Sequence, residues 1–186
     1  MDILIFFITL TAEVLTTLAV AMSIARPQRR IWPPSRQRAW GRYCMLILFG
    51  VSGAGVILLG ILDWGSFAIP AWIRVAAGVP LWLVGNLLAL WAVSALGAAS
   101  TSGDAGTLIR RGPYGFSRNP QYLGFIIGLV GWALMSDSWL ALIVSIAGIA
   151  PLVWVPLAEE PWLLERYGTA YAEYTRTVPR FVPGWK

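Results

Sequence analysis

The sequence predicts an all-α, polytopic membrane protein with about five transmembrane helices and a cytoplasmic amphipathic helix near the C-terminus. Of its 186 residues, 58% are hydrophobic and 12% are charged, whereas a soluble domain carries roughly 25% charged residues. Apolar stretches close to the length of a bilayer crossing recur along the chain. Basic residues gather in the polar segments between them, as in oriented membrane proteins. Residues 1–186 are therefore treated as one transmembrane domain.

Composition also excludes several kinds of site. The chain has no histidine, which removes the commonest general base near neutral pH, together with His-ligated metals and Ser-His-Asp triads. The one cysteine, Cys44, can form neither an internal disulfide nor a thiolate metal site. No metal site is expected. The net charge of +5 lies in short loops, so it reflects membrane topology rather than nucleic-acid binding. The bilayer is the expected partner, and no obligate protein partner is indicated.

Three apolar segments occupy the first half of the chain. Residues 3–25 are expected to form a retained helix rather than a cleaved leader, because no basic residue precedes the apolar run. Residues 43–62 form a second helix, whose many glycines would let a neighbouring helix approach closely. Residues 69–99 are too long for one straight crossing, and Pro80 is expected to kink them.

Two further apolar segments, residues 121–135 and 139–157, are separated by a tight polar turn and read as a helical hairpin. Pro161 suits the first position of a new helix, where its missing N–H costs nothing. An amphipathic helix is expected from there, because apolar and aromatic residues recur at helical spacing. They are Leu163, Leu164, Tyr167, Tyr171 and Tyr174. The three tyrosines are expected to form an interfacial aromatic belt.

Five crossings would place every basic residue except Arg74 on one side of the membrane. The positive-inside rule makes that side cytoplasmic. An integral membrane protein of bacterial inner-membrane type is expected, with the N-terminus outside and the C-terminus in the cytoplasm.

The polar segment before the fourth apolar stretch carries the first chemical motif. An Asn-Pro pair pushes Asn119 out of helical geometry, so a helix should begin at Pro120. Arg118 and Asn119 then lie at a helix N-terminus, where free backbone N–H groups favour an anionic group such as a carboxylate.

The second motif is the adjacent pair Glu159 and Glu160, at the end of the fifth apolar stretch. Two acids at a membrane boundary are costly unless they have partners. Arg118 or Arg111 could pair with one of them, and a cationic ligand could be held by the other. The alternative is that both acids only favour the start of the helix that follows.

In this order and spacing, the motifs resemble the isoprenylcysteine carboxyl methyltransferase family, whose relatives include methyltransferases acting on phospholipid amines and on small thiols. The resemblance covers residues 100–186, the methyltransferase-like part of the chain. It is carried by Gly112, Tyr114, Arg118, Asn119, Pro120, Tyr122 and Gly124, then by Glu159, Glu160, Leu163, Tyr167, Gly168, Tyr171 and Tyr174, and last by Val178, Pro179, Arg180 and Pro183.

The resemblance implies S-adenosyl-L-methionine as the methyl donor, with Glu159 holding the amino group of its methionine moiety. The cofactor residues that it implies are Gly106, Thr107, Leu108, Ile109, Tyr114, Asn119, Pro120, Gln121, Tyr122 and Glu159. Arg118 and Glu160 are the candidate catalytic residues. The expected function is methyl transfer to a lipophilic or small acceptor.

Two departures from the family pattern bear on the acceptor. Asn119 stands where the family has histidine, so that side chain cannot transfer a proton. Val155 stands where the carboxyl methyltransferases have an arginine for the substrate carboxylate. An isoprenylcysteine-like acceptor remains possible. A carboxylate or thiol is favoured, because a protonated amine would need a base, for which Glu160 or a tyrosinate is the candidate.

Two alternative functions remain open, and so do the roles of two intramembrane polar residues. The alternatives are a phospholipid amine N-methyltransferase and a non-catalytic, lipid-binding protein on the same scaffold. A membrane reductase that uses a nicotinamide cofactor is a further reading, although the chain has no clear dinucleotide fingerprint. Glu13 is by position a functional candidate, with a helix-to-helix hydrogen bond as its alternative. Asn86 more often makes such a hydrogen bond.

Overall fold

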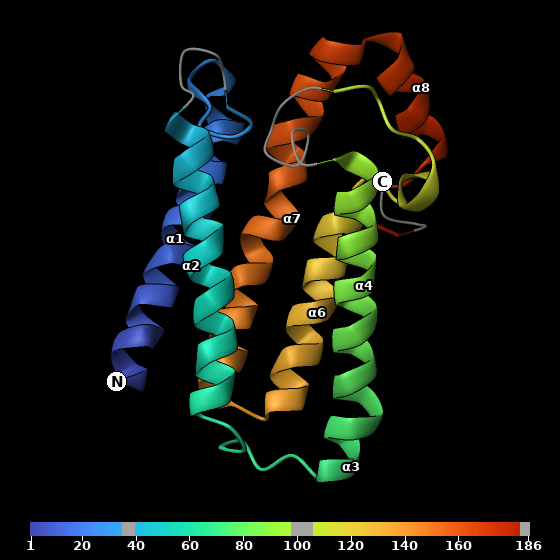
Figure 1. The fold of residues 1–186 in the computed structure, drawn as a ribbon. Coiled ribbons are helices and arrows are strands. Elements are labelled where there is room, and N and C mark those ends of the chain that lie inside the picture. Colours follow the sequence, from blue (N-terminus) through green and yellow to red (C-terminus); the bar gives the residue numbers. More distant parts are fainter. Residues whose placement is uncertain (35–39, 98–105, 183–186) are drawn as a thin grey trace.

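The computed structural model describes residues 1–34, 40–97 and 106–182, and the ordered elements in these ranges are helices, with no strand. Five long helices lie side by side and a short one caps them at one end (Figure 1). The long helices are α1 (Asp2–Ala25), α2 (Trp40–Leu62), α4 (Val79–Leu96), α6 (Pro120–Ser136) and α7 (Trp139–Tyr167), and the capping helix is α8 (Thr169–Thr177). The all-helical prediction is confirmed.

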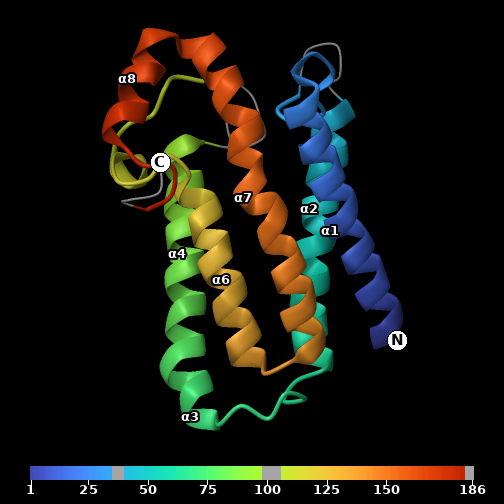
Figure 2. The ribbon, with the colours of Figure 1, turned by 180° about the vertical axis from the view of Figure 1, so that it is seen from behind.

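The chain is an integral membrane protein by the length and composition of its helices. Four helical stretches are long and apolar enough to cross a bilayer, and α6 is a shorter apolar helix packed among them. The view from behind shows the same arrangement of neighbours (Figure 2). Large apolar side chains face outward, as lipid contact requires; Ile47 is 65% exposed and Leu87 is 63% exposed.

The third predicted apolar segment, which begins at residue 69, is not one straight helix, as its length suggested. A short helix, α3 (Ala71–Ile73), leads into a π-helical turn, η3 (Arg74–Gly78), and then into α4. Pro80 lies at the start of α4, directly after the π-helical turn. The irregularity predicted at Pro80 is therefore present, as a widened turn in the residues that precede it.

Close backbone contact joins α4, with the turn before it, to α6. A Cβ atom added at Gly124 would lie 2.6 Å from the Ala89 nitrogen, and one at Gly78 would lie 2.7 Å from the Met135 nitrogen. In α2, by contrast, Gly50 and Gly53 have nothing within 4 Å of such an atom. The expectation that the α2 glycines serve close packing is wrong at those two positions, because they lie on a face that no neighbouring helix covers.

Helix α7 does not end where the sequence suggested. It continues from Trp139 to Tyr167 through Pro151, Pro156 and Pro161, so the predicted helix start at Pro161 is wrong. Prolines are tolerated within membrane helices, where neighbouring groups satisfy the freed backbone. The helix instead ends at Gly168, whose φ of +56° suits glycine.

Two of the tyrosines expected at the membrane interface are buried. Tyr171 and Tyr174 of α8 are 3% and 5% exposed and form a cluster with Val178 and Leu108. The aromatic-belt prediction is wrong for these two, because the segment that begins at Gly106 covers them. The amphipathic helix is therefore docked on the protein.

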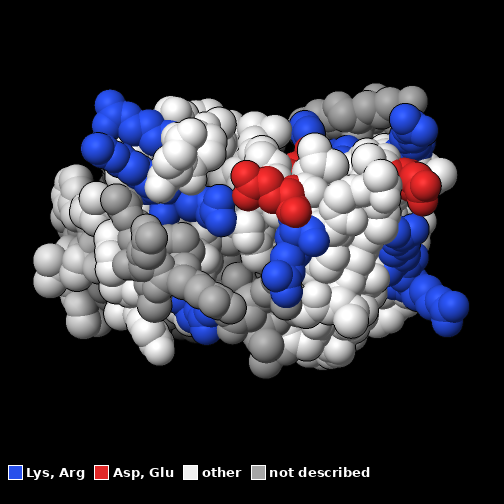
Figure 3. All heavy atoms as spheres, turned by 90° about the horizontal axis from the view of Figure 1, so that it is seen from above, with Lys and Arg blue, Asp and Glu red and all other residues white. Residues whose placement is uncertain are grey.

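One end of the bundle carries almost all the basic side chains, and we call it the basic end. It comprises residues 26–30, residues 106–119 and α8 with the chain that follows (Figure 1). Viewed onto this end, basic side chains spread across the surface with acidic ones between them (Figure 3). Among the described basic residues, Arg74 alone lies at the opposite end, where it contacts Asp137 and the Trp64 ring. The predicted charge asymmetry is confirmed.

Candidate functional site

Glu160, near the basic end of α7, is neutralised by two arginines. Its carboxylate accepts hydrogen bonds from Arg180 Nε and Nη2 at 2.9 and 2.7 Å. Arg118 Nη1 lies 3.2 Å from Oε1 of the same carboxylate. We call these three residues the Glu160 triad. It joins α7 to the start of α6 and to the C-terminal segment.

The C-terminal segment is also held by the residues that precede α6. The Arg118 backbone N–H donates to the Pro179 carbonyl at 2.9 Å. The Asn119 side-chain amide donates to the Arg180 carbonyl at 3.0 Å. Asn119 is 8% exposed and stands at the N-cap of α6 without capping it through its side chain. Asn119 therefore positions the chain end, and its amide oxygen and second N–H are left for other partners.

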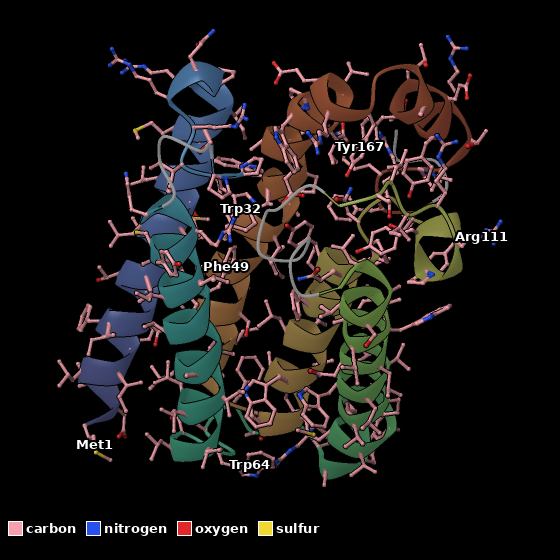
Figure 4. The ribbon with its side chains drawn as sticks, turned by 45° about the horizontal axis from the view of Figure 1, so that its top comes forward. Met1, Trp32, Phe49, Trp64, Arg111 and Tyr167 are labelled. Carbon is pink, nitrogen blue, oxygen red and sulfur yellow. The ribbon has the colours of Figure 1, made fainter. Side chains whose placement is uncertain are left out.

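Glu159, one residue earlier, has neutral neighbours. Its Oε1 accepts hydrogen bonds from Trp32 Nε1 at 2.7 Å and from the Tyr122 hydroxyl at 2.8 Å. Figure 4 shows Trp32 lying between the α1–α2 end of the bundle and α7. Within the described ranges, no side chain bonds Oε2 of Glu159 and no arginine or lysine pairs with it. One carboxylate oxygen is thus left for a ligand.

Tyr114 lies close enough to Glu159 to interact with it electrostatically. It belongs to a short 3-10 turn, η4 (Gly112–Gly115), and is 8% exposed. Burial and the nearby Glu159 carboxylate raise the pKa of the Tyr114 hydroxyl, so it stays protonated. Its backbone carbonyl accepts a hydrogen bond of 2.7 Å from the Tyr174 hydroxyl. Helix α8 therefore fixes the turn that carries Tyr114.

The run from Gly106 to Ile109 passes between α8 and the bundle. The Gly106 carbonyl accepts a hydrogen bond of 2.7 Å from the Tyr167 hydroxyl, and Leu108 packs on the α8 tyrosines. Thr107 is exposed and Ile109 is partly buried. This run is therefore anchored at the basic end.

A cavity of about 400 Å³ opens beneath Glu159. Trp32 and Tyr122, which both bond Glu159, also line it, and Gln121 lines it beside Tyr122. Pro120 is buried at the first turn of α6 and sets the start of that helix. The cavity then continues between α2, α4, α6 and α7 toward the middle of the bundle.

Two groups emerge from the predicted residues. Glu159, Tyr122 and Tyr114 form one, and the Glu160 triad forms the other. The predicted pairing of Arg118 with an acid is present, whereas Arg111 is exposed and points away from the bundle (Figure 4). The cofactor-binding and catalytic roles stay predictions. No group of three or more potential acid, cysteine or histidine metal ligands occurs in the described part of the chain.

Sequence reasoning missed two participants. A tryptophan in a basic, proline-bearing segment is typical of the membrane interface, and nothing near Trp32 in the sequence indicated a partner 127 residues away. Arg180 was noticed only as part of the C-terminal motif, and its pairing with Glu160 follows from the fold. The acid pair and the arginine of the C-terminal motif could have suggested that pairing.

The comparisons with known proteins fit this geometry. The family model described as phospholipid methyltransferase matches residues 73–170, which is more than half of the chain. The matched range contains η4, α6, Glu159 and Glu160. No solved structure matches.

Two curated relatives are similar over part of their length. The steroid 5-alpha-reductase DET2 of Solanum lycopersicum is 31% identical over 111 residues, which are 60% of this chain and 43% of that protein. The nickel-cobalt-cadmium resistance protein NccN of Alcaligenes xylosoxydans xylosoxydans is 30% identical over 135 residues, 69% of this chain and 60% of that protein. The matches span less than two thirds of either relative. By its matched range and its all-helical membrane fold, this chain belongs to the phospholipid methyltransferase family.

Proposed function

We propose that this protein is an S-adenosyl-L-methionine-dependent methyltransferase that methylates an acceptor drawn from the membrane. One observation carries the proposal: Glu159 is a partly buried carboxylate held by two neutral donors on one oxygen, with the other oxygen unbonded among the described residues. Burying such a carboxylate is costly unless a cation lies nearby or the group takes up a proton. The ammonium of a methionine moiety supplies such a cation.

The residues around Glu159 fit the rest of such a cofactor. Tyr114 and Tyr122 offer aromatic faces beside the carboxylate, and aromatic rings pack well on a purine. The run from Gly106 to Ile109 offers backbone groups at the basic end. Asn119 retains an amide oxygen and one N–H for hydrogen bonding.

When bound, S-adenosyl-L-methionine supplies a methyl group already activated by the sulfonium. The protein then has to orient the two reactants and exclude water. Trp32 and Tyr122 hold Glu159 in place, and the apolar cavity beneath them is a dry compartment for the acceptor. The Glu160 triad fixes the start of α6 against α7. Glu160 and Arg118 therefore position the part of the cavity wall that these two helices form. With both its oxygens engaged by arginines, Glu160 is a weak candidate for a base.

The absence of histidine favours an acceptor that needs no base. A carboxylate or a thiolate is already a nucleophile, whereas a protonated amine must first lose a proton. We place the basic end in the cytoplasm on the positive-inside rule, so that the cofactor enters from the water phase and the acceptor from the lipid.

A second candidate is a reductase with a nicotinamide cofactor. The 31% identity to a protein described as a steroid 5-alpha-reductase favours it. The two candidates differ in ligand, because a nicotinamide dinucleotide carries a diphosphate whereas S-adenosyl-L-methionine carries an ammonium.

Calorimetry on the purified protein in detergent separates the two candidates. S-adenosylhomocysteine should bind, and NADPH should not. Binding of NADPH alone would assign the site to the reductase class. Binding of neither ligand to folded protein would overturn the proposed function.

A further inference from the structure

The cavity beneath Glu159 is long and mostly apolar, with Ser52, Asn86 and Gln121 among its polar lining residues. It reaches along α6 from Tyr122 to Trp132, ten residues apart, which is about 15 Å of helix. Leu46 and Ile57 of α2 line it and are 45% and 51% exposed. The cavity is therefore reachable from the lipid past α2, and its volume of about 400 Å³ suits a drug-sized or lipid-like molecule.

One charged residue lines this cavity, and it lies far from the basic end. Glu13, in the middle of α1, is 6% exposed and belongs to the cavity wall. A Cβ atom added at Gly148 of α7 would lie 2.8 Å from its Oε1, so the absence of a side chain there makes room for the carboxyl. Arginine and lysine are absent from the cavity lining. Glu13 thus has no ionic partner in the wall.

The polar neighbours of Glu13 leave part of the hydrogen-bonding capacity of its carboxyl group unused. The Ser52 hydroxyl lies beside its carboxyl. An ionised carboxylate has about four acceptor positions, and one hydroxyl can fill only one of them. A polar group in an apolar cavity is costly when it lacks partners. The ligand that occupies the cavity can provide the missing partner.

The distance between the two acids constrains the shape of that ligand. Gly148, beside Glu13, precedes Glu159 by eleven residues in α7, which corresponds to about 16 Å along the helix. A group held at Glu13 is therefore not the atom that reacts near Glu159. It belongs to the distant part of the same molecule.

We propose that Glu13 selects the acceptor: the cavity takes an elongated apolar molecule that carries a hydrogen-bond-donating group, a hydroxyl or an amine, about 16 Å from the end that lies beneath Glu159. A plain acyl or isoprenoid chain would leave Glu13 without a partner and is a poor ligand. The identification of this ligand as the methyl acceptor rests on the proposed function.

The test uses matched bromoalkane probes and the tryptophans of the cavity wall. Trp32, Trp82 and Trp132 line the cavity, so a brominated ligand bound there quenches their fluorescence. The probes are 12-bromododecylamine, 12-bromododecanol and 1-bromododecane, titrated into the purified full-length protein in detergent. The amine or the alcohol should bind about tenfold or more tightly than the alkane, the usual size of one hydrogen bond to a charged group.

Two substitutions of Glu13 separate the possible donors. Glu13→Leu removes every acceptor and should abolish the preference over the alkane; since it replaces a buried carboxyl by an apolar side chain, it is expected to fold. Glu13→Gln keeps an acceptor oxygen and removes the charge, so a preferred alcohol should survive it and a preferred amine should not. Glu173→Gln, at an exposed acid of α8, is the matched control.

Equal binding of all three probes by the parent protein would overturn the inference, as would an unchanged preference in Glu13→Leu. If Glu13→Leu failed to fold, Gly148→Ala would replace it: the added methyl displaces the carboxyl and should reduce the preference at least threefold. Binding of S-adenosylhomocysteine, measured on the same samples, tests the proposed function independently. If S-adenosylhomocysteine did not bind but the probe preference still depended on Glu13, the proposed function would fail and the inference about the cavity would stand.

Discussion

Glu159 and Glu160 are adjacent in the sequence and have opposite surroundings. Glu160 faces two arginines that cancel its charge and tie three segments together. Glu159 faces an indole N–H and a phenol hydroxyl, which orient its carboxylate without cancelling the charge. A carboxylate neutralised within the protein serves the fold, whereas one left with neutral donors is available to a ligand. From this difference we expect distinct roles for two identical side chains.

The strongest way to break this contrast is to place a cation beside Glu159. Val155 lies one helical turn before Glu159, is fully buried and packs with Val20 and Met45. Val155→Arg should reduce the free energy of unfolding by about 3–5 kcal/mol, because a charge enters an apolar cluster. Thermal unfolding in detergent measures the loss. An unchanged midpoint would mean that the introduced guanidinium pairs with Glu159, and S-adenosylhomocysteine binding should then be lost.

Removing the charge of Glu160 should mainly affect stability. Glu160→Gln leaves Arg118 and Arg180 without their shared anion, at a cost of about 2–3 kcal/mol in unfolding free energy. Titration with a denaturing detergent measures it. Glu173→Gln, at an exposed position, is the control and should change little. Stability equal to that of the control would show that the Glu160 triad does not hold the chain end.

Removing the charge of Glu159 should mainly affect cofactor affinity. Glu159→Gln should weaken S-adenosylhomocysteine binding by roughly 1.5–3 kcal/mol, the range for a hydrogen bond to a charged group. Stability should stay close to that of the parent, because both existing partners can still donate to the amide oxygen. Unchanged affinity measured by calorimetry would remove Glu159 from the site.

The smallest expected effect is on stability at alkaline pH. It concerns Tyr174, whose hydroxyl bonds the turn that carries Tyr114. Burial raises the pKa of Tyr174 to about 12, against the lowering influence of Arg118 and Arg110. An unfolded tyrosine loses its proton near pH 10. This raised pKa therefore stabilises the fold below about pH 10, and its contribution is lost as the pH rises toward 12.

Tyr174→Phe should make the decline in stability between pH 10 and 12 less steep. At neutral pH it should cost about 1 kcal/mol, for the lost hydrogen bond to the Tyr114 carbonyl. Tyr43→Phe, at an exposed tyrosine of α2, is the control. The same slope for Tyr174→Phe and parent would contradict the assignment.

The sequence allowed the helices to be predicted well, because each is a long apolar run between polar segments. The exception was α7, where Pro161 suggested a new helix and the helix in fact continues to Tyr167. Local sequence cannot show that a proline is tolerated when the surrounding structure compensates for its lost hydrogen bond.

The candidate site was predictable only where motifs are local. Arg118, Asn119 and Pro120 at the start of α6 follow from the Asn-Pro pair, and the structure places them there. The partnership of Trp32 with Glu159 depends on α1 and α2 packing beside α7, which no local pattern records. The same is true of Glu13, whose place in the cavity wall depends on Gly148.

The chain end bonded to Asn119 and Glu160 also has a consequence for biosynthesis. Synthesis proceeds from the N-terminus, so Arg180 emerges after helices α1 to α8 have been made. Until then, Glu160 and Arg118 lack their third partner, and the Asn119 amide lacks its acceptor. A chain that stops before residue 178 would therefore be inserted in the membrane with its basic end unfinished. Residues 179 and 180 thus complete the packing of the basic end only after the helices that they join have been made.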